Sequence, residues 1–216
     1  GLFRQTIENG FQREYADDWQ KYGDPWSRRN DTEAVDVVYS DMTVKAVPYD
    51  MPIIGFGTKN IGTLRLWQAE AEEEFDFSAF NDGKYESAVK AKTDAENISK
   101  VLYPNDNFDE GRILRLRQEY FFSAASLADI TAKHKAKYGS LDELYKYVTI
   151  QLNDTHPVIS ILELMRILVD ENGYSFDKAF DITKKTFNYT NHTVMQEALE
   201  KWSTKLVEKL LPRVFK

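Results

Sequence analysis

The last third of the chain alternates strand-like and helix-like segments, and this alternation limits the fold more than any other feature of the sequence. Residues 148–152 and 187–190 have the short pattern of strands. Helices are predicted between them, over residues 157–169 and 176–185, and after them, over residues 196–211. Strands connected by helices favour a parallel sheet with helices on its faces, so we expect an α/β fold.

The first third of the chain has the pattern of antiparallel β structure. Asn9-Gly10 lies between two strand-like segments and favours a hairpin, because a type I′ turn needs positive φ at both central residues. Further strands are predicted over residues 35–39, 43–47 and 61–69, where β-branched and aromatic residues concentrate. Residues 1–69 are therefore expected to be mostly β.

Two long helices are predicted in the middle of the chain. The acidic stretch 70–76 is interpreted as a solvated connector that ends in a loop at residues 81–83. Residues 84–102 have only a thin apolar stripe, which indicates a helix that projects into solvent or meets a partner. Residues 112–137 have a broad apolar stripe and precede Gly139, which indicates a core helix. Ser140 is expected to cap a short helix that runs through Tyr147.

Composition excludes several classes of protein. Of the 216 residues, 42% are hydrophobic, which is enough for a packed core and excludes a disordered chain. The formal net charge of −7 argues against binding to nucleic acid or to an anionic membrane. No apolar stretch approaches the roughly 18 residues of a membrane span. Cysteine is absent, so a reducing compartment is the default and we expect a cytoplasmic location.

Two of the three histidines stand where a parallel sheet binds ligands. His134 lies among lysines in a predicted helix and is interpreted as a surface residue. His156 and His192 each follow a predicted strand, in turns rich in Asn, Asp and Thr. Ligands of open parallel sheets bind outside the carboxyl ends of the strands. If the two strands are neighbours, both turns face one crevice.

That crevice would gather side chains suited to the hydroxyls of a sugar: Asp154, Thr155, His156, Asn191, His192 and Thr193. Two other interpretations stay open. The turns could simply cap the helices that follow, because Asp, Asn and Thr cap helices without any ligand. A metal site of His156, His192 and Asp154 is disfavoured, because the histidines lie 36 residues apart whereas zinc ligands usually have tight local spacing.

A third candidate is the loop Asn105-Asp106-Asn107-Phe108, between the two long helices. An ordinary polar turn would have the same residues and need no function. Alternatively, the loop hydrogen-bonds a ligand and gates access to it.

Several stretches together resemble the α-glucan phosphorylases, the family of glycogen, starch and maltodextrin phosphorylases. The most specific stretch is Gln151-Leu152-Asn153-Asp154-Thr155-His156-Pro157, followed by Glu163-Leu164-Met165-Arg166-Ile167-Leu168-Val169-Asp170. Further support comes from Tyr189-Thr190-Asn191-His192-Thr193-Val194, Glu197-Ala198-Leu199-Glu200-Lys201-Trp202, Ala16-Asp17-Asp18-Trp19, Leu64-Arg65-Leu66-Trp67 and the stretch from Ala95 to Phe108. The similarity covers nearly the whole chain in order.

The resemblance implies an α/β fold: a partial Rossmann-like N-terminal domain of a two-domain glycosyltransferase of the GT-B type. It would have an antiparallel β portion, a protruding tower-like helix over 84–102 and a parallel part over 148–211. This family cleaves terminal α-1,4-linked glucose with phosphate to give glucose 1-phosphate, with pyridoxal phosphate as proton donor and acceptor. Residues 1–216 would be one internal segment, inactive alone, without the C-terminal domain that holds the cofactor Lys. Both ends of the chain also read as cut, so we expect a piece of a longer protein.

The resemblance also implies site residues. His192 would contact the donor glucosyl unit through its side chain and backbone carbonyl. Asn107 would bond a glucosyl hydroxyl, Asp106 would order the loop, and Phe108 would lie at the mouth of the cleft. The neighbouring pocket would be lined by Asp154, Thr155, His156, Thr193 and Glu200.

Substrates and partners follow from the same resemblance. They would be an α-1,4-glucan, phosphate and a second copy of the protein, which the helix over 84–102, including Asn97, would contact across a homodimer. Two other functions stay open. The chain could be a stand-alone, non-catalytic saccharide-binding or assembly module, or part of a glycosyltransferase that uses a nucleotide sugar.

Overall fold

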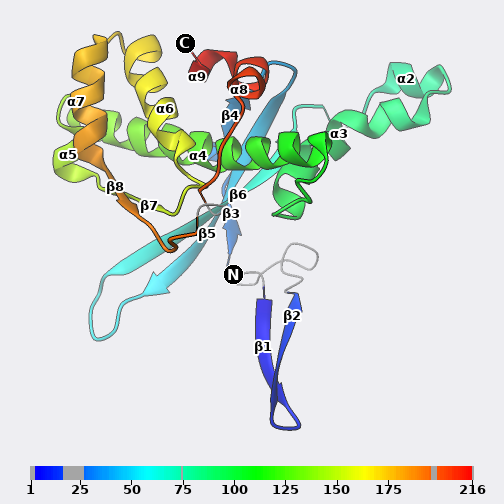
Figure 1. The fold of residues 1–216 in the computed structure, drawn as a ribbon, viewed down its shortest axis with the longest axis horizontal. Helices are drawn as coiled ribbons and strands as arrows, with labels where there is room; N and C mark the ends of the chain where they lie inside the picture. Colours follow the sequence, from blue (N-terminus) through cyan, green and yellow to red (C-terminus); the bar gives the residue numbers. More distant parts are fainter. Residues whose placement is uncertain (1–2, 17–26, 74, 196–198, 216) are drawn as a thin grey trace.

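A computed structural model of the chain describes residues 3–16, 27–73, 75–195 and 199–215 and shows a mixed α/β structure (Figure 1). Strands β1 (Phe3–Glu8) and β2 (Phe11–Ala16) form an antiparallel hairpin. Asn9 and Gly10 both have positive φ, 52° and 80°, which confirms the predicted turn. Residues 17–19 of the resemblance and the expected helix start at Gln196 lie outside the described residues.

The main sheet has four antiparallel strands. Strand β5 (Thr43–Ile54) lies at its centre and pairs with β6 (Ile61–Ala71) along most of its length. On its other side it pairs with β4 (Val35–Val38) near one end and with the short β3 (Arg28–Arg29) further along. A single turn of 3₁₀ helix, Asp31–Glu33, connects β3 to β4.

Strand β5 is longer than the sequence predicts. The expected strand ends at residue 47, before Pro48, whereas pairing with β6 continues to Ile54. Proline usually interrupts a central strand because it has no N–H to donate. The carbonyl of Pro48 accepts a hydrogen bond from Asn30 N at 2.9 Å, on the β3 side. In an antiparallel sheet, the N–H and C=O of one residue point toward the same neighbouring strand. Those of Pro48 point toward the β3 side, so its missing N–H removes no hydrogen bond between β5 and β6.

The acidic stretch is only partly a solvated connector. Strand β6 continues to Ala71, and Glu70 accepts a hydrogen bond from Arg29 Nη2 at 2.9 Å. Helix α2 (Phe77–Asn81) follows, with Asp76 Oδ1 accepting from Ala79 N at 3.0 Å as an N-cap. The predicted loop at residues 81–83 therefore begins within the last turn of a helix.

Helix α3 (Tyr85–Lys100) is the predicted thin-striped helix, and only its first half projects. Together with α2 it extends to one side of the molecule (Figure 1). Its second half packs against β6, where Ala95 and Ile98 are fully buried and Ser99 Oγ accepts from Ala69 N at 2.9 Å. Asn97 is exposed.

Helix α4 (Asp109–Tyr138) crosses the middle of the molecule as a core helix and ends at Gly139, whose φ is 82°. The prediction for His134 was wrong. His134 is only 5% exposed, and its ring packs against Tyr138 and Tyr147 at centroid distances of 4.7 and 5.8 Å. Residues beyond the helix end fold back and cover it, which the pattern of one helix cannot reveal.

The cap prediction for Ser140 was also wrong. Helix α5 (Leu144–Tyr147) has Glu143, not Ser140, at its N-cap position, and no side chain caps it. Ser140 Oγ instead donates to Asp142 Oδ2 at 2.8 Å, within the turn that precedes the helix.

The last third confirms the expected parallel strands. Strand β7 (Ile150–Asn153) leads into α6 (Ile159–Arg166), which continues as a π-helical stretch, Ile167–Glu171. Helix α7 (Phe176–Thr186) begins after Ser175, whose Oγ accepts from Lys178 N as predicted, and leads into β8 (Phe187–Thr190). Strands β7 and β8 are parallel neighbours.

The final helix differs from the prediction. Two short helices, α8 (Thr204–Leu210) and α9 (Pro212–Phe215), stand where one helix from residue 196 was expected. The described residues 199–203 are not helical, and two of their side chains are bound to α4: Glu200 Oε1 accepts from Arg115 Nε at 2.5 Å, and Trp202 Nε1 donates to Glu119 Oε2 at 3.2 Å.

The core consists of two clusters of apolar residues, and α4 contributes to both. One cluster lies between the main sheet, α3, the first half of α4, and helices α8 and α9. The other is built by α5, α6, α7 and the second half of α4. Strands β7 and β8 border this second cluster. In the described residues, no helix is both long and apolar enough to cross a bilayer.

Candidate functional site

The turns after β7 and β8 lie side by side, as the sequence predicts. Asn153 and Thr190 are opposite each other at the ends of the two strands, and Asp154 N donates to Thr190 O at 2.9 Å. Asp154 has a positive φ of 68°, and its Oδ1 accepts from Thr155 N at 2.8 Å. The two segments therefore leave the sheet together at its carboxyl edge.

The side chain of His192 reaches across to the other turn. Its Nε2 hydrogen-bonds Asn153 Oδ1, and the residue is exposed. Because the amide oxygen of Asn153 accepts, the neutral imidazole carries its hydrogen on Nε2 and leaves Nδ1 as an acceptor. The contact joins the two turns directly.

The structure does not support the interpretation of these turns as helix caps. Helix α6 begins after Val158 and has no side-chain cap. Asp154 bonds the next residue's N–H, outside the helix. In the described residues after β8, the next helix starts only at Thr204. The polar side chains of the turns therefore order the turns themselves.

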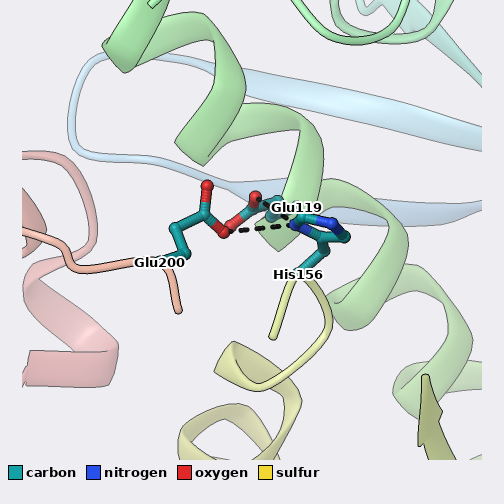
Figure 2. A group of neighbouring side chains, drawn as sticks. All are labelled: Glu119, His156 and Glu200. Carbon is teal, nitrogen blue, oxygen red and sulfur yellow. Dashed lines mark hydrogen bonds and ion pairs between the residues drawn. The ribbon is translucent and has the colours of Figure 1, made fainter. Parts of the chain in front are cut away.

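His156 belongs to a more enclosed group of charged side chains (Figure 2). Its Nδ1 lies 3.4 Å from Glu200 Oε2 and 3.8 Å from Glu119 Oε1. Arg115 Nε donates to Glu200 Oε1 at 2.5 Å, and Arg115 Nη2 lies 3.3 Å from His156 Nδ1. We call Arg115, Glu119, His156 and Glu200 the charged cluster.

The two carboxylates of the charged cluster have different surroundings. Glu200 has the close contact with Arg115, whereas Glu119 Oε1 is 3.4 Å from Arg115 Nε and Oε2 accepts from Trp202 Nε1 at 3.2 Å. Burial, the hydrogen bond with Glu200 and the charge of Glu200 raise the pKa of Glu119 to about 9, although Arg115 and the Trp202 indole act to lower it. Glu119 is therefore the carboxyl group that keeps a proton near neutral pH.

A metal ion does not fit this group well. Ligand atoms of Glu119, His156 and Glu200 lie within 4.8 Å of one another, and this is the one such group of three in the described residues. The guanidinium of Arg115 already contacts Glu200 and His156, so it supplies the positive charge and would repel a cation there. The structure does not bring together His156, His192 and Asp154, the possible metal ligands considered from the sequence.

A cavity of about 350 Å³ lies between α4 and β7. Its walls are mainly apolar and include Phe122, Ile150 and Leu152, and the charged cluster closes one end with Arg115, Glu119 and His156. Of the site residues named from the sequence, His156 is the one that lines this cavity. Asp154, Thr155, Thr193 and Glu200 are half-buried nearby, outside its lining.

The loop Asn105-Asp106-Asn107-Phe108 is exposed and bound closely to the start of α4. Asn105 Oδ1 accepts from Asn107 N at 3.0 Å, and Arg112 Nη1 donates to Asp106 O at 2.9 Å. The ring of Tyr103, just before the loop, packs edge-on to His156 at 6.1 Å and lies 5.7 Å from the Arg115 guanidinium. In the described residues no hydrogen bond joins Asn107 to His192.

Arg115 and Glu119 were missed by the sequence analysis. Both lie on α4, which was interpreted as a core helix because of its apolar stripe. Their spacing of four residues places an opposite-charge pair on one face of that helix, next to the apolar Phe122. That local pairing was the available signal, but their contact with His156 and Glu200 depends on the tertiary fold.

Comparisons with known proteins decide the family. A sequence profile of the carbohydrate phosphorylase family matches residues 1–216, the whole chain. The chain belongs to this family. It is 48% identical over 235 residues to the brain form of glycogen phosphorylase from Rattus norvegicus and 47% identical over 235 residues to the liver form from Homo sapiens. It is 44% identical over 232 residues to glycogen phosphorylase from Chlamydia trachomatis.

These alignments also show how much of a phosphorylase the chain represents. Each covers 99% of this chain and 28% of the relative. The chain therefore spans about 28% of the length of these phosphorylases, and the resemblance drawn from the sequence is confirmed for this segment.

Proposed function

We propose that the protein containing this chain is an α-glucan phosphorylase, and that this segment positions the glucosyl unit that is cleaved. The reaction would transfer the terminal α-1,4-linked glucose of a glucan to phosphate and release glucose 1-phosphate. The observation that carries the proposal is the paired turns after β7 and β8, held together by His192 and Asn153, in a chain of the carbohydrate phosphorylase family.

His192 suits a sugar for chemical reasons. Its Nε2 is held by Asn153, so Nδ1 and the exposed ring edge are available to a hydroxyl group. Asn107 would bond a second hydroxyl from the loop before α4, with Asp106 ordering the loop and Phe108 at its exposed side. Fixed donors and acceptors of this kind favour cleavage because they place the reacting bond before charge develops.

Pyridoxal phosphate would be held elsewhere in the protein. No lysine lines the cavity between α4 and β7, and Arg115, the cation there, is paired with Glu200. The cofactor Lys would lie in a C-terminal domain, which would face this segment in a two-domain GT-B arrangement with a Rossmann-like half on each side.

A homodimer through α3, with residues 84–102 at the contact, is part of the same proposal. Helix α2 and the first half of α3 project from the molecule, and they carry an exposed group of rings, Phe77, Phe80 and Tyr85. Exposed aromatic residues are enriched in protein interfaces. The cytoplasmic location and the absence of nucleic-acid and membrane partners stay predictions.

The test is an assay of the full-length protein with an α-1,4-glucan and inorganic phosphate. The proposal predicts release of glucose 1-phosphate. A protein that binds the glucan without releasing product would favour the saccharide-binding module. Transfer of glucose from a nucleotide sugar, without phosphorolysis, would favour the other class of glycosyltransferase.

A further inference from the structure

The charged cluster holds two enclosed carboxyl groups against one fixed positive charge. The side chains of Glu119 and Glu200 are 10% and 14% exposed, and their carboxyl groups face one another beside His156 (Figure 2). Arg115 can balance one negative charge, and its 2.5 Å contact goes to Glu200. Two ionised carboxylates this enclosed repel each other, which favours a proton on one of them.

We propose that Glu119 is a positioning residue that keeps its proton and donates a hydrogen bond to the Glu200 carboxylate. When Glu119 is protonated, its hydrogen bond fixes the position of the Glu200 carboxylate. Glu200 and Arg115 then keep the imidazole of His156 in place. This inference rests on the proposed function and adds to it a residue that the sequence analysis did not identify.

A continuous set of contacts leads from Glu119 to the proposed glucosyl site. Glu119 and Glu200 both lie near His156, which belongs to the turn after β7. This turn directly follows Asn153, the last residue of β7, whose side chain hydrogen-bonds the ring of His192. A shift of the His156 turn would therefore move Asn153 and, through it, His192. A displacement of about 1 Å in a positioning group can reduce turnover by about a hundredfold.

The groups around Glu119 define what a change in pH would do. Arg115 faces it from α4, His156 from the turn after β7, and Glu200 and the Trp202 indole from the segment before α8. Further out, Tyr103 packs on Arg115 and His156, and Asp106 acts on Arg115 electrostatically. Loss of the proton from Glu119 would leave two carboxylates on one guanidinium and push them apart. Turnover should therefore fall as the pH rises into the alkaline range.

Glu119→Gln and Glu119→Ala in the full-length protein separate a positioning role from a packing role. The amide of Gln is a donor at every pH, so Glu119→Gln should keep kcat within about twofold at neutral pH and lose the alkaline decrease seen in the wild type. Glu119→Ala lacks the donor and should lower kcat about tenfold or more at every pH, with a smaller change in KM. A pure packing role would leave the alkaline decrease the same in the wild type and in Glu119→Gln, and that result would overturn the inference.

An infrared measurement tests the proton without relying on activity. A protonated carboxyl group has a carbonyl stretch distinct from that of a carboxylate, so the wild-type spectrum minus that of Glu119→Gln at neutral pH should contain this band. Absence of the band would show that Glu119 is ionised and would overturn the inference. This holds even if the assay shows no phosphorolysis, so failure of the proposed function and failure of this inference give different results.

Discussion

Single residues show how closely the candidate gate loop is fitted to α4. Gly111 lies in the first turn of that helix, and a Cβ there would stand 1.8 Å from the carbonyl oxygen of Asn105. No side chain can be accommodated without moving the backbone that leads to Asp106 and Asn107. The loop and the helix start are therefore one unit, and Gly111 is part of what places Asn107.

We predict that Gly111→Ala destabilises the protein by about 1–3 kcal/mol, because the added methyl group forces the loop away from the helix. Urea unfolding of the variant and the wild type measures this. Gly62→Ala is the matched control, since its Cβ would be 3.8 Å from its nearest neighbours, Ile53 Cβ and Ile53 O. Equal unfolding midpoints for Gly111→Ala and the wild type would show that the loop is not held in this way.

His134 should make stability depend on pH. Burial lowers the pKa of its imidazole, and in the described residues its Nδ1 has no hydrogen-bond partner. The folded protein therefore keeps the ring neutral while the unfolded chain takes up a proton below about pH 6.5. The stability contributed by the neutral ring is present above that pH and is lost as the pH falls through the folded-state pKa.

The measurement is the unfolding midpoint at about pH 7.5 and about pH 5 for the wild type and for His134→Leu. The wild type should lose more stability on acidification than the variant, because Leu removes the group that titrates. If both lose the same amount, His134 does not couple protonation to folding.

The roles of single residues could be predicted where they depend on neighbouring residues in the sequence. Asn9-Gly10, Gly139 and Ser175 have their roles within a few residues of sequence, and all three were predicted. Arg115 and Glu119 depend on contacts with residues 37 to 85 positions away, so no local pattern could assign them. The prediction for His134 failed because Tyr147, beyond the end of α4, packs against its ring.

At the scale of elements, α4 and α6 are joined by buried polar groups within an apolar core. Glu163 is 2% exposed and accepts two hydrogen bonds from Arg166, at 2.8 and 2.7 Å, and one from Tyr120 Oη at 2.9 Å. Arg166 also donates to Glu171 at 2.7 Å. The stretch Glu163-Leu164-Met165-Arg166, which helped to carry the resemblance, therefore has a structural role in this fold.

Arg166→Ala should destabilise the protein by about 3–5 kcal/mol, because it leaves Glu163 buried without its cation. Thermal or urea unfolding gives the free energy. Lys90→Ala removes one partner of the exposed pair with Asp94 in α3 and should cost less than about 1 kcal/mol. Similar losses for the two variants would contradict the view that Arg166 neutralises the buried Glu163.

The elements were predictable where one pattern extended over many residues. The 30-residue α4 was found within three residues of each end, and the β7–α6–α7–β8 order was found as observed. The predicted strand ended too early, at residue 47, because a proline usually ends a central strand. Pro48 is accommodated in β5 because its main-chain polar groups face β3 and not β6. The final helix was predicted too long because Glu200 and Trp202 contact α4, and these long-range contacts leave no local pattern in the sequence.

At the scale of the whole molecule, the chain leaves apolar and pairing surfaces open. Strands β7 and β8 form a sheet of only two parallel strands in the described residues, whereas parallel sheets are normally larger and covered on both faces. The far end of the β5–β6 hairpin extends beyond the other strands of the main sheet (Figure 1). It carries exposed apolar side chains, among them Ile54 and Phe56.

We therefore expect the 216-residue chain alone to self-associate, since apolar patches and open strand edges promote association. Sedimentation velocity over a range of concentrations measures this. The double variant Ile54→Lys, Phe56→Lys should shift the distribution of sedimentation coefficients toward the monomer. Lys59→Arg in the same turn should leave it unchanged. A wild-type chain that stays monomeric at every concentration would contradict the expectation.

The central claim is that the paired turns position a glucosyl unit, and His192 tests it most directly. The measurement is the rate of glucose 1-phosphate release by the full-length protein carrying His192→Ala or Asn107→Ala, with Asn60→Ala in the exposed β5–β6 turn as the matched control. The account predicts a loss of about a hundredfold in kcat for His192→Ala, a smaller loss for Asn107→Ala and no change for the control. Wild-type turnover in His192→Ala, with the fold intact, would contradict it.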